Sequence, residues 1–199
     1  MSSIVKHGFA AAILALTSST ATAVDAQARL APVYERLESE GERNAVLNQM
    51  ELGARAYELN DYEVATRAFD DALNQIESFY SNKEGAEQAR SLWYEEGKKD
   101  FKGEPYERVM AYYYRGLLYL QEQDWDNARA SFEGGMLQDA FAEEDQNRFD
   151  FALMAYLSAW ASFREGNNVM QARALKELAA LRKDVPAFGK GHNTLLVVE

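Results

Sequence analysis

The stretch Gly103–Phe132, GEPYERVMAYYYRGLLYLQEQDWDNARASF, decides the fold of this chain. Apolar side chains recur in it at helical spacing on both sides of a polar break, Gln121–Asp124. Pro105 suits the first turn of a helix, where its missing N–H is no loss. Small residues stand where two helices must approach closely, at Gly116 and Ala128, and large aromatic residues flank them. The stretch therefore predicts a helical hairpin whose two helices bury a shared apolar stripe.

The upstream sequence contains a twin of this hairpin. Each copy has a small residue on its first helix, an Asp–aromatic pair in its turn, and an Ala and a Phe on its second helix, all at the same spacing. These positions are Gly53, Asp61-Tyr62, Ala65 and Phe69 in the first copy, and Gly116, Asp124-Trp125, Ala128 and Phe132 in the second. A third, weaker copy follows, which lacks the aromatic residue on its second helix. Terminal repeats in a stack are often atypical in this way.

These positions resemble those of the tetratricopeptide repeat (TPR), a helix–turn–helix unit of about 34 residues. The sequence departs from the family where Asn60 and Gln123 replace the usual Gly of the turn, and where the Pro that often closes a repeat is absent. The resemblance implies an all-α fold, a right-handed superhelix of about three helical hairpins. The repeats would lie near residues 44–81, 105–140 and 149–182 of a domain spanning 24–182, with an insertion at 82–104.

Residues 1–23 have the pattern of a secretory signal peptide. Lys6 and His7 precede a short apolar run, and the small-residue motif Ala21-Thr22-Ala23 follows it. The run is far shorter than the roughly 20 residues that a membrane span needs. We expect cleavage before Val24, or near it at Ala28, and a soluble protein exported to the periplasm or the outside of a bacterial cell. The alternative is a buried N-terminal helix.

The last residues, 183–199, predict a linker followed by the start of a short β-like segment. Pro186, Gly189 and Gly191 interrupt the helical pattern, and the apolar run 194–198 is typical of a strand. Because the run ends at Glu199 without a polar cap, we expect the natural chain to continue.

The block Phe101–Met110 and the Tyr-rich helix after it resemble a group of exported bacterial TPR-like envelope proteins without an assigned reaction. The shared motif is Gly-Glu-x-Tyr-Glu-Arg, and the resemblance covers roughly residues 44–199. It implies the fold and a location in the cell envelope. Many members of that group are lipoproteins, but this chain contains no cysteine, so we expect no lipid anchor.

Charge and composition exclude several classes of function. With 32 acidic against 21 basic residues, the net charge of −11 repels phosphate backbones, so we expect no nucleic-acid partner. The lack of cysteine excludes thiolate metal sites. Asp124 and Asp126 have the spacing that opens a calcium loop, but Ala128 stands at the fifth ligand position. We interpret both as turn residues and helix caps, and expect no metal and no cofactor.

The chain also lacks the sequence motifs of a catalytic site. His192 is the one histidine after the signal peptide, and it stands among glycines, where we expect it to be solvated. The acidic pairs Glu95-Glu96 and Glu143-Glu144 could act as paired carboxylates. Such runs usually form solvated faces, so we do not expect an enzyme.

In the TPR family the first helix of each unit lines the concave face, and the resemblance assigns that face here. The concave positions are Leu47, Met50, Ala54, Tyr57, Glu58, Met110, Tyr113, Leu117, Leu120, Gln121, Leu153, Tyr156, Trp160, Phe163 and Arg164. Among them, the predicted partner-binding residues are Met50, Tyr57, Tyr113, Leu117, Tyr156, Trp160 and Phe163. An apolar, aromatic groove suits an amphipathic helix or an extended apolar peptide.

Three charged residues before and within the central hairpin form a candidate polar rim of this groove: Glu104, Glu107 and Arg108. In the alternative interpretation, the two glutamates stabilise the helix N-terminus through its dipole, and Arg108 ties the insertion to the repeats.

The groove is either open to a partner or filled by the chain itself. The insertion Asn82–Lys102 and the helix Asp25–Glu38 are the candidates for filling it. If either fills it, the aromatic residues are core, and we expect Tyr113 to be more buried than Tyr57.

Together these features predict a non-catalytic protein-binding or scaffold module of the bacterial cell envelope, with a protein or peptide partner. One alternative is an accessory subunit that docks an envelope enzyme or a secretion complex. Another, less supported, is an enzyme that acts on cell-wall glycan with paired carboxylates.

Overall fold

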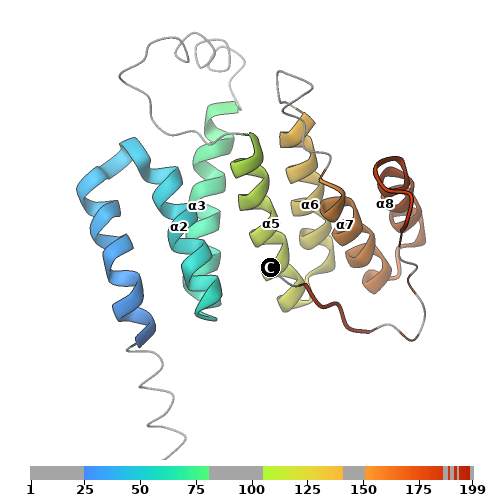
Figure 1. Ribbon diagram of the computed structural model, residues 1–199, viewed down its shortest axis with the longest axis horizontal. Helices are drawn as coiled ribbons and strands as arrows, with labels where there is room; N and C mark the ends of the chain where they lie inside the picture. The colour runs from blue at the N-terminus through green and yellow to red at the C-terminus, as the bar shows by residue number, and fades with distance from the viewer. Residues whose placement is uncertain are drawn as a thin grey trace, which may run out of the picture.

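The computed structural model describes residues 25–80, 105–140, 151–185, 188, 191 and 193–197 (Figure 1). Within these ranges every regular element is helical, which confirms the all-α class. The expected signal peptide (1–23), the insertion (82–104) and the acidic pair at 143–144 lie outside the described residues.

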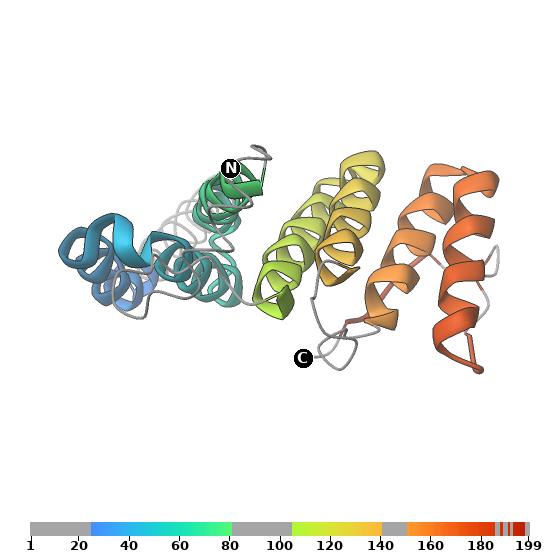
Figure 2. The same cartoon turned by 90° about the horizontal axis from the view of Figure 1, so that it is seen from above.

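The helices follow one another as antiparallel neighbours. A helix over residues 25–40 runs into the short 3-10 helix η1 (Gly41–Asn44). The remaining helices are α2 (Ala45–Glu58), α3 (Tyr62–Tyr80), α5 (Pro105–Glu122), α6 (Trp125–Ala140), α7 (Ala152–Glu165) and α8 (Asn168–Leu181). The pairs α2/α3, α5/α6 and α7/α8 are hairpins that stand side by side in chain order, with α3 against α5 and α6 against α7 (Figures 1 and 2).

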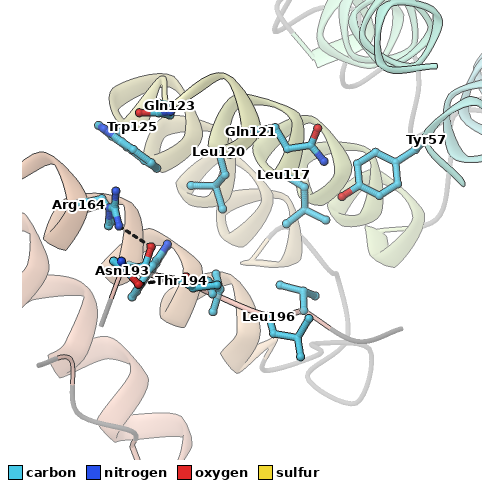
Figure 3. Close-up of a pocket in the computed structure, with 13 residues that line it drawn as sticks. Tyr57, Leu117, Leu120, Gln121, Gln123, Trp125, Arg164, Asn193, Thr194 and Leu196 are labelled. Atoms are coloured by element: carbon cyan, nitrogen blue, oxygen red, sulfur yellow. Dashed lines mark hydrogen bonds between the residues drawn. The ribbon is translucent and has the colours of Figure 1, made fainter. Parts of the chain in front are cut away.

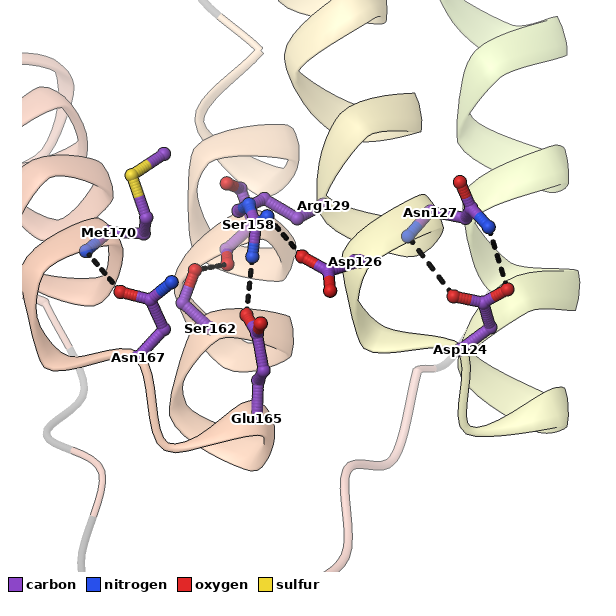
Figure 4. Close-up of polar contacts among 9 residues, drawn as sticks. All are labelled: Asp124, Asp126, Asn127, Arg129, Ser158, Ser162, Glu165, Asn167 and Met170. Carbon is purple, nitrogen blue, oxygen red and sulfur yellow. Dashed lines mark hydrogen bonds and ion pairs between the residues drawn. The ribbon is translucent and has the colours of Figure 1, made fainter.

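The hairpin turns use residues in the left-handed region of backbone space. Asn60 and Gln123, in the first two turns, both have φ of 60°, and Gly166 has φ of 82° in the third turn. Asp61 and Asp124 each accept a hydrogen bond from the backbone N–H three residues later, as Figure 4 shows for Asp124. This confirms that Asp124 is a helix-capping residue, which satisfies a donor of the following helix.

Inside the first two hairpins, a phenylalanine ring lies directly on a glycine of the facing helix. A Cβ placed on Gly53 would lie 2.7 Å from Cε2 of Phe69, and one on Gly116 would lie 2.3 Å from Cε1 of Phe132. Both rings are almost fully buried. The twin positions of the sequence therefore make twin contacts, and only glycine lets the helices approach so closely.

Ion pairs join neighbouring hairpins. The guanidinium of Arg115 on α5 donates to Oδ1 of Asp70 on α3 at 2.6 Å, and it lies 3.6 Å from the centroid of the Tyr119 ring. Arg129 on α6 donates to Asp126 on its own helix and to Glu165 at the end of α7 (Figure 4). Both arginine side chains are largely buried, so these pairs are screened less than surface pairs.

The helix over residues 25–40 packs at the outer end of the row (Figure 1). Leu30 and Val33 belong to the hydrophobic core. Arg36 pairs with Glu51 of α2, and the amide of Asn48 donates to a carboxylate oxygen of Glu40 at 2.9 Å. This helix therefore extends the stack beyond the first hairpin.

After α8 the chain turns back along the row. Residues 193–197 are neither helix nor strand, so the expected β-like segment is not confirmed in the part that the structure describes. Leu195 and Val197 pack against the core, although both are distant in sequence from the helices they meet. Figure 1 shows this segment in red, running from below α8 to the lower end of α5.

Candidate functional site

A cavity of about 490 Å³ opens where α2, α5 and α7 face the returning C-terminal segment (Figure 3). We call it the groove, and its helical and turn residues are Tyr57, Leu117, Leu120, Gln121, Gln123, Trp125, Trp160 and Arg164. Residues 193–197 form its remaining wall. Because α2, α5 and α7 are the first helices of the three hairpins, each hairpin contributes side chains to one shared surface.

Among the described residues that line the groove, Arg164 is the one with a charged side chain. Its guanidinium carbon lies 5.1 Å from the Trp125 ring centroid and 5.8 Å from that of Trp160. Its Nη1 donates to the backbone oxygen of Asn193 at 2.7 Å. The two indole rings attract and orient the cation. The side chain is thus a positioned donor that contacts the main chain of a peptide segment.

An aromatic cluster continues the contact surface along α7. The ring of Phe188 lies 5.2 Å from Tyr156, 5.7 Å from Trp160 and 5.5 Å from Phe163, measured between centroids. Phe188 and Phe163 are stacked, and Phe188 meets Trp160 edge to face. These geometries are the favourable ones for aromatic pairs. A single aromatic residue of the C-terminal segment therefore occupies a pocket of three rings.

The burial of the side chains alternates along the C-terminal segment. Leu195 and Val197 are half-buried and pack against the core, whereas Leu196 between them is 81% exposed, although it too lines the groove. A period of two is the side-chain period of an extended backbone. The alternation therefore favours an extended backbone for these residues, which belong to neither a helix nor a strand.

The structure separates the seven predicted partner-binding residues into three groups. Tyr57, Leu117 and Trp160 line the groove, and Tyr156 and Phe163 contact Phe188. Met50 is half-buried against the core and Tyr113 is 2% exposed, and neither is among the residues that line the groove. Tyr57 is only half-buried, which confirms that Tyr113 is the more buried tyrosine.

The candidate polar rim does not form around Arg108. This arginine is 3% exposed, and its Nε donates to Oε1 of Gln138 on α6 at 3.1 Å. Glu107 stands in the first turn of α5, where its charge stabilises the helix N-terminus. Glu104 lies outside the described residues. Arg108 therefore holds α5 to α6, and the groove has no rim built from it.

Of the two segments that the sequence suggests for filling the groove, the structure tests only one. The helix over residues 25–40 packs beside α2 and contributes no residue to the groove, and the insertion lies outside the described residues. Residues 193–197 form one wall of the groove, and Phe188 packs against aromatic rings of α7. Sequence analysis missed these residues and Trp125 as parts of the site. The apolar run Leu195–Val197 was the available signal, because an apolar run needs a surface to cover it.

The described residues contain no group of three His, Cys, Asp or Glu side chains that could hold a metal ion. Among their helices, none combines the length and the apolar character that crossing a membrane requires. Comparison with protein-family models, with curated proteins and with solved structures finds no match to this chain.

Proposed function

We propose that this protein is a non-catalytic binding or scaffold module of the bacterial cell envelope, exported by residues 1–23, which holds a protein or peptide partner in the groove. In this proposal the three hairpins are TPR-type units of a right-handed superhelix. The observation that carries it is the convergence of α2, α5 and α7 on one surface of aromatic and aliphatic side chains, which includes the cation of Arg164 beside two indole rings.

The composition of the groove supports binding. Tyr, Trp and Arg are the residue types that dominate the binding energy of protein interfaces, and Tyr57, Trp125, Trp160 and Arg164 all stand here. The groove residues Gln121 and Gln123 add amide groups that can pair with a peptide backbone. A partner would therefore find an apolar surface with a few polar groups, which is the usual make-up of a recognition site.

Site-specific photocrosslinking in a bacterial host tests this function. A photoreactive phenylalanine analogue replaces Leu120, which lines the groove, and in a matched control it replaces Leu137, which is 56% exposed on α6 and does not line it. We expect one reproducible protein adduct from position 120 that position 137 does not give. Its identity separates a free-standing scaffold from an accessory subunit of an enzyme or secretion complex.

The same adducts at both positions, or none at position 120, would contradict the proposal. Turnover of purified cell wall by the protein would contradict its non-catalytic part.

A further inference from the structure

The C-terminal segment, meaning Phe188 and residues 193–197, makes the contacts that a bound peptide would make. It has an aromatic anchor among three rings of α7, a backbone carbonyl that accepts from Arg164, and alternate side chains packed against the core. Main-chain hydrogen bonds with pockets for alternate side chains are the general means by which proteins bind extended peptides. The segment therefore shows which ligand shape the groove accepts.

The segment is held much less firmly than the helices. Leu195 and Val197 are only half-buried, and Asn193, Thr194 and Leu196 are exposed, whereas Leu117 and Trp160 beneath them are about 5% exposed. Stability is not uniform across a structure, and elements with few buried contacts open at the lowest free energy. Detaching the segment would leave the three hairpins and their core contacts in place.

We infer that the C-terminal segment is an internal competitor that covers the helical side of the groove, and that the partner is an extended peptide of the same type. This inference rests on the proposed function and names its ligand and its regulation. The partner peptide has an aromatic residue for the Tyr156–Trp160–Phe163 pocket, followed by two apolar residues separated by one. Binding requires that the partner displace the protein's own segment.

The geometry favours an extended peptide over an amphipathic helix. A helix satisfies its own backbone carbonyls except in its last turn, so along most of its length it would offer no backbone partner to the Arg164 donor, which lies near two indole rings. Buried residues also recur every three or four positions on a helix. In the segment, by contrast, Leu195 and Val197 pack against the core and Leu196 between them is exposed.

Because the competitor belongs to the same chain, its effective concentration is high even when each contact is weak. An occupied groove lowers the apparent affinity for a partner by the fraction of molecules in which the groove is free. The partner would therefore bind far more tightly once the segment is released.

Fluorescence anisotropy with a labelled synthetic peptide of residues 184–197 tests the inference on full-length protein. The comparison uses the wild type, the double variant Leu195→Asp/Val197→Asp, and the control Val169→Asp, at an exposed position of α8 that does not line the groove. If the segment fills the groove in nine of ten molecules, the double variant binds the peptide about tenfold more tightly than wild type. The control should match wild type. Adding Arg164→Gln to the double variant should weaken binding again.

Equal affinity of the peptide for wild type and for the double variant would overturn the inference, as would failure to bind the double variant. The crosslinking experiment distinguishes a failure of this inference from a failure of the proposed function. If the peptide behaves as expected but position 120 captures no protein, the competitor stands and the proposed function fails. If a partner crosslinks equally to wild type and to the double variant, the function stands and the competition is overturned.

Discussion

The contact between Gly116 and Phe132 shows how single residues set the spacing of a hairpin. An added Cβ would overlap the ring, which is fully buried and has no free direction in which to move. We expect Gly116→Ala to lower the free energy of unfolding by about 1–3 kcal/mol, the usual cost of overpacking. This loss should exceed the gain of roughly 1 kcal/mol that is expected because Ala is a better helix former than Gly. Urea denaturation measures it.

A double-mutant cycle identifies the cause of that loss. In the Phe132→Leu background the ring is gone, so Gly116→Ala should cost much less than in wild type. An equal cost of Gly116→Ala in both backgrounds would show that the ring contact does not set the spacing.

Tyr112 makes stability depend on pH in the alkaline range. Burial raises the pKa of its hydroxyl, and the hydrogen bond to Oε1 of Glu77, at 2.8 Å, raises it further. The native state therefore favours the neutral phenol. Its stabilising contribution is complete below a pH of about 10, the pKa of an unperturbed tyrosine, and is lost as the pH rises from there toward the raised pKa.

We therefore expect the free energy of unfolding of wild type to fall more steeply above pH 10 than that of Tyr112→Phe. At neutral pH the variant should lose about 0.5–1.5 kcal/mol, the worth of one hydrogen bond. Chemical denaturation from pH 7 to 11 measures both. Parallel pH profiles for the two proteins would show that Tyr112 is not the titrating group.

Among the elements, Arg129 links the second hairpin to the third. Burial acts to lower the pKa of its guanidinium, but hydrogen bonds to Asp126 and Glu165 outweigh this and raise it. The side chain is 15% exposed, while Arg173, in an ion pair with Glu177 on α8, is 61% exposed. Arg129→Gln should cost about 1.5–3 kcal/mol, as for hydrogen bonds to charged groups.

The matched control, Arg173→Gln, should change stability by less than about 1 kcal/mol, because exposed ion pairs contribute little. Thermal unfolding of the two variants makes the comparison. Equal losses would mean that the α6–α7 junction does not depend on this arginine.

The helical elements were predictable because their signals are local. Small and aromatic residues at repeated spacing predict the α2/α3 and α5/α6 hairpins, and Asp61 and Asp124 mark their turns. The burial of Arg108 was not predictable, because its partner Gln138 lies on another helix, 30 residues away. A charged residue near a helix start is usually exposed, and only tertiary packing shows that it is not.

Over the whole molecule, the first helices of three hairpins build one groove, and the end of the described chain returns to it. The aromatic character of that face follows from the repeat positions. The segment that covers this face could not be predicted in the same way. The strand-like pattern of residues 194–198 indicates only an extended conformation and does not show which surface these residues contact. Whether an apolar run forms a sheet or lies on a distant helical surface depends on long-range contacts that no local pattern contains.

The most direct test of this account is the position of the C-terminal segment in solution. The chain has no cysteine, so Leu196→Cys, at an 81% exposed position, gives a single site for a nitroxide label. Paramagnetic broadening of NMR signals then reports which residues lie near it. We predict strong broadening of the Leu117 and Leu120 methyl groups and the Trp125 indole, with unchanged signals from the helix over residues 25–40 at the far end of the row (Figure 1). Unbroadened Leu120 and Trp125 signals would show that the segment does not occupy the groove and would contradict the account.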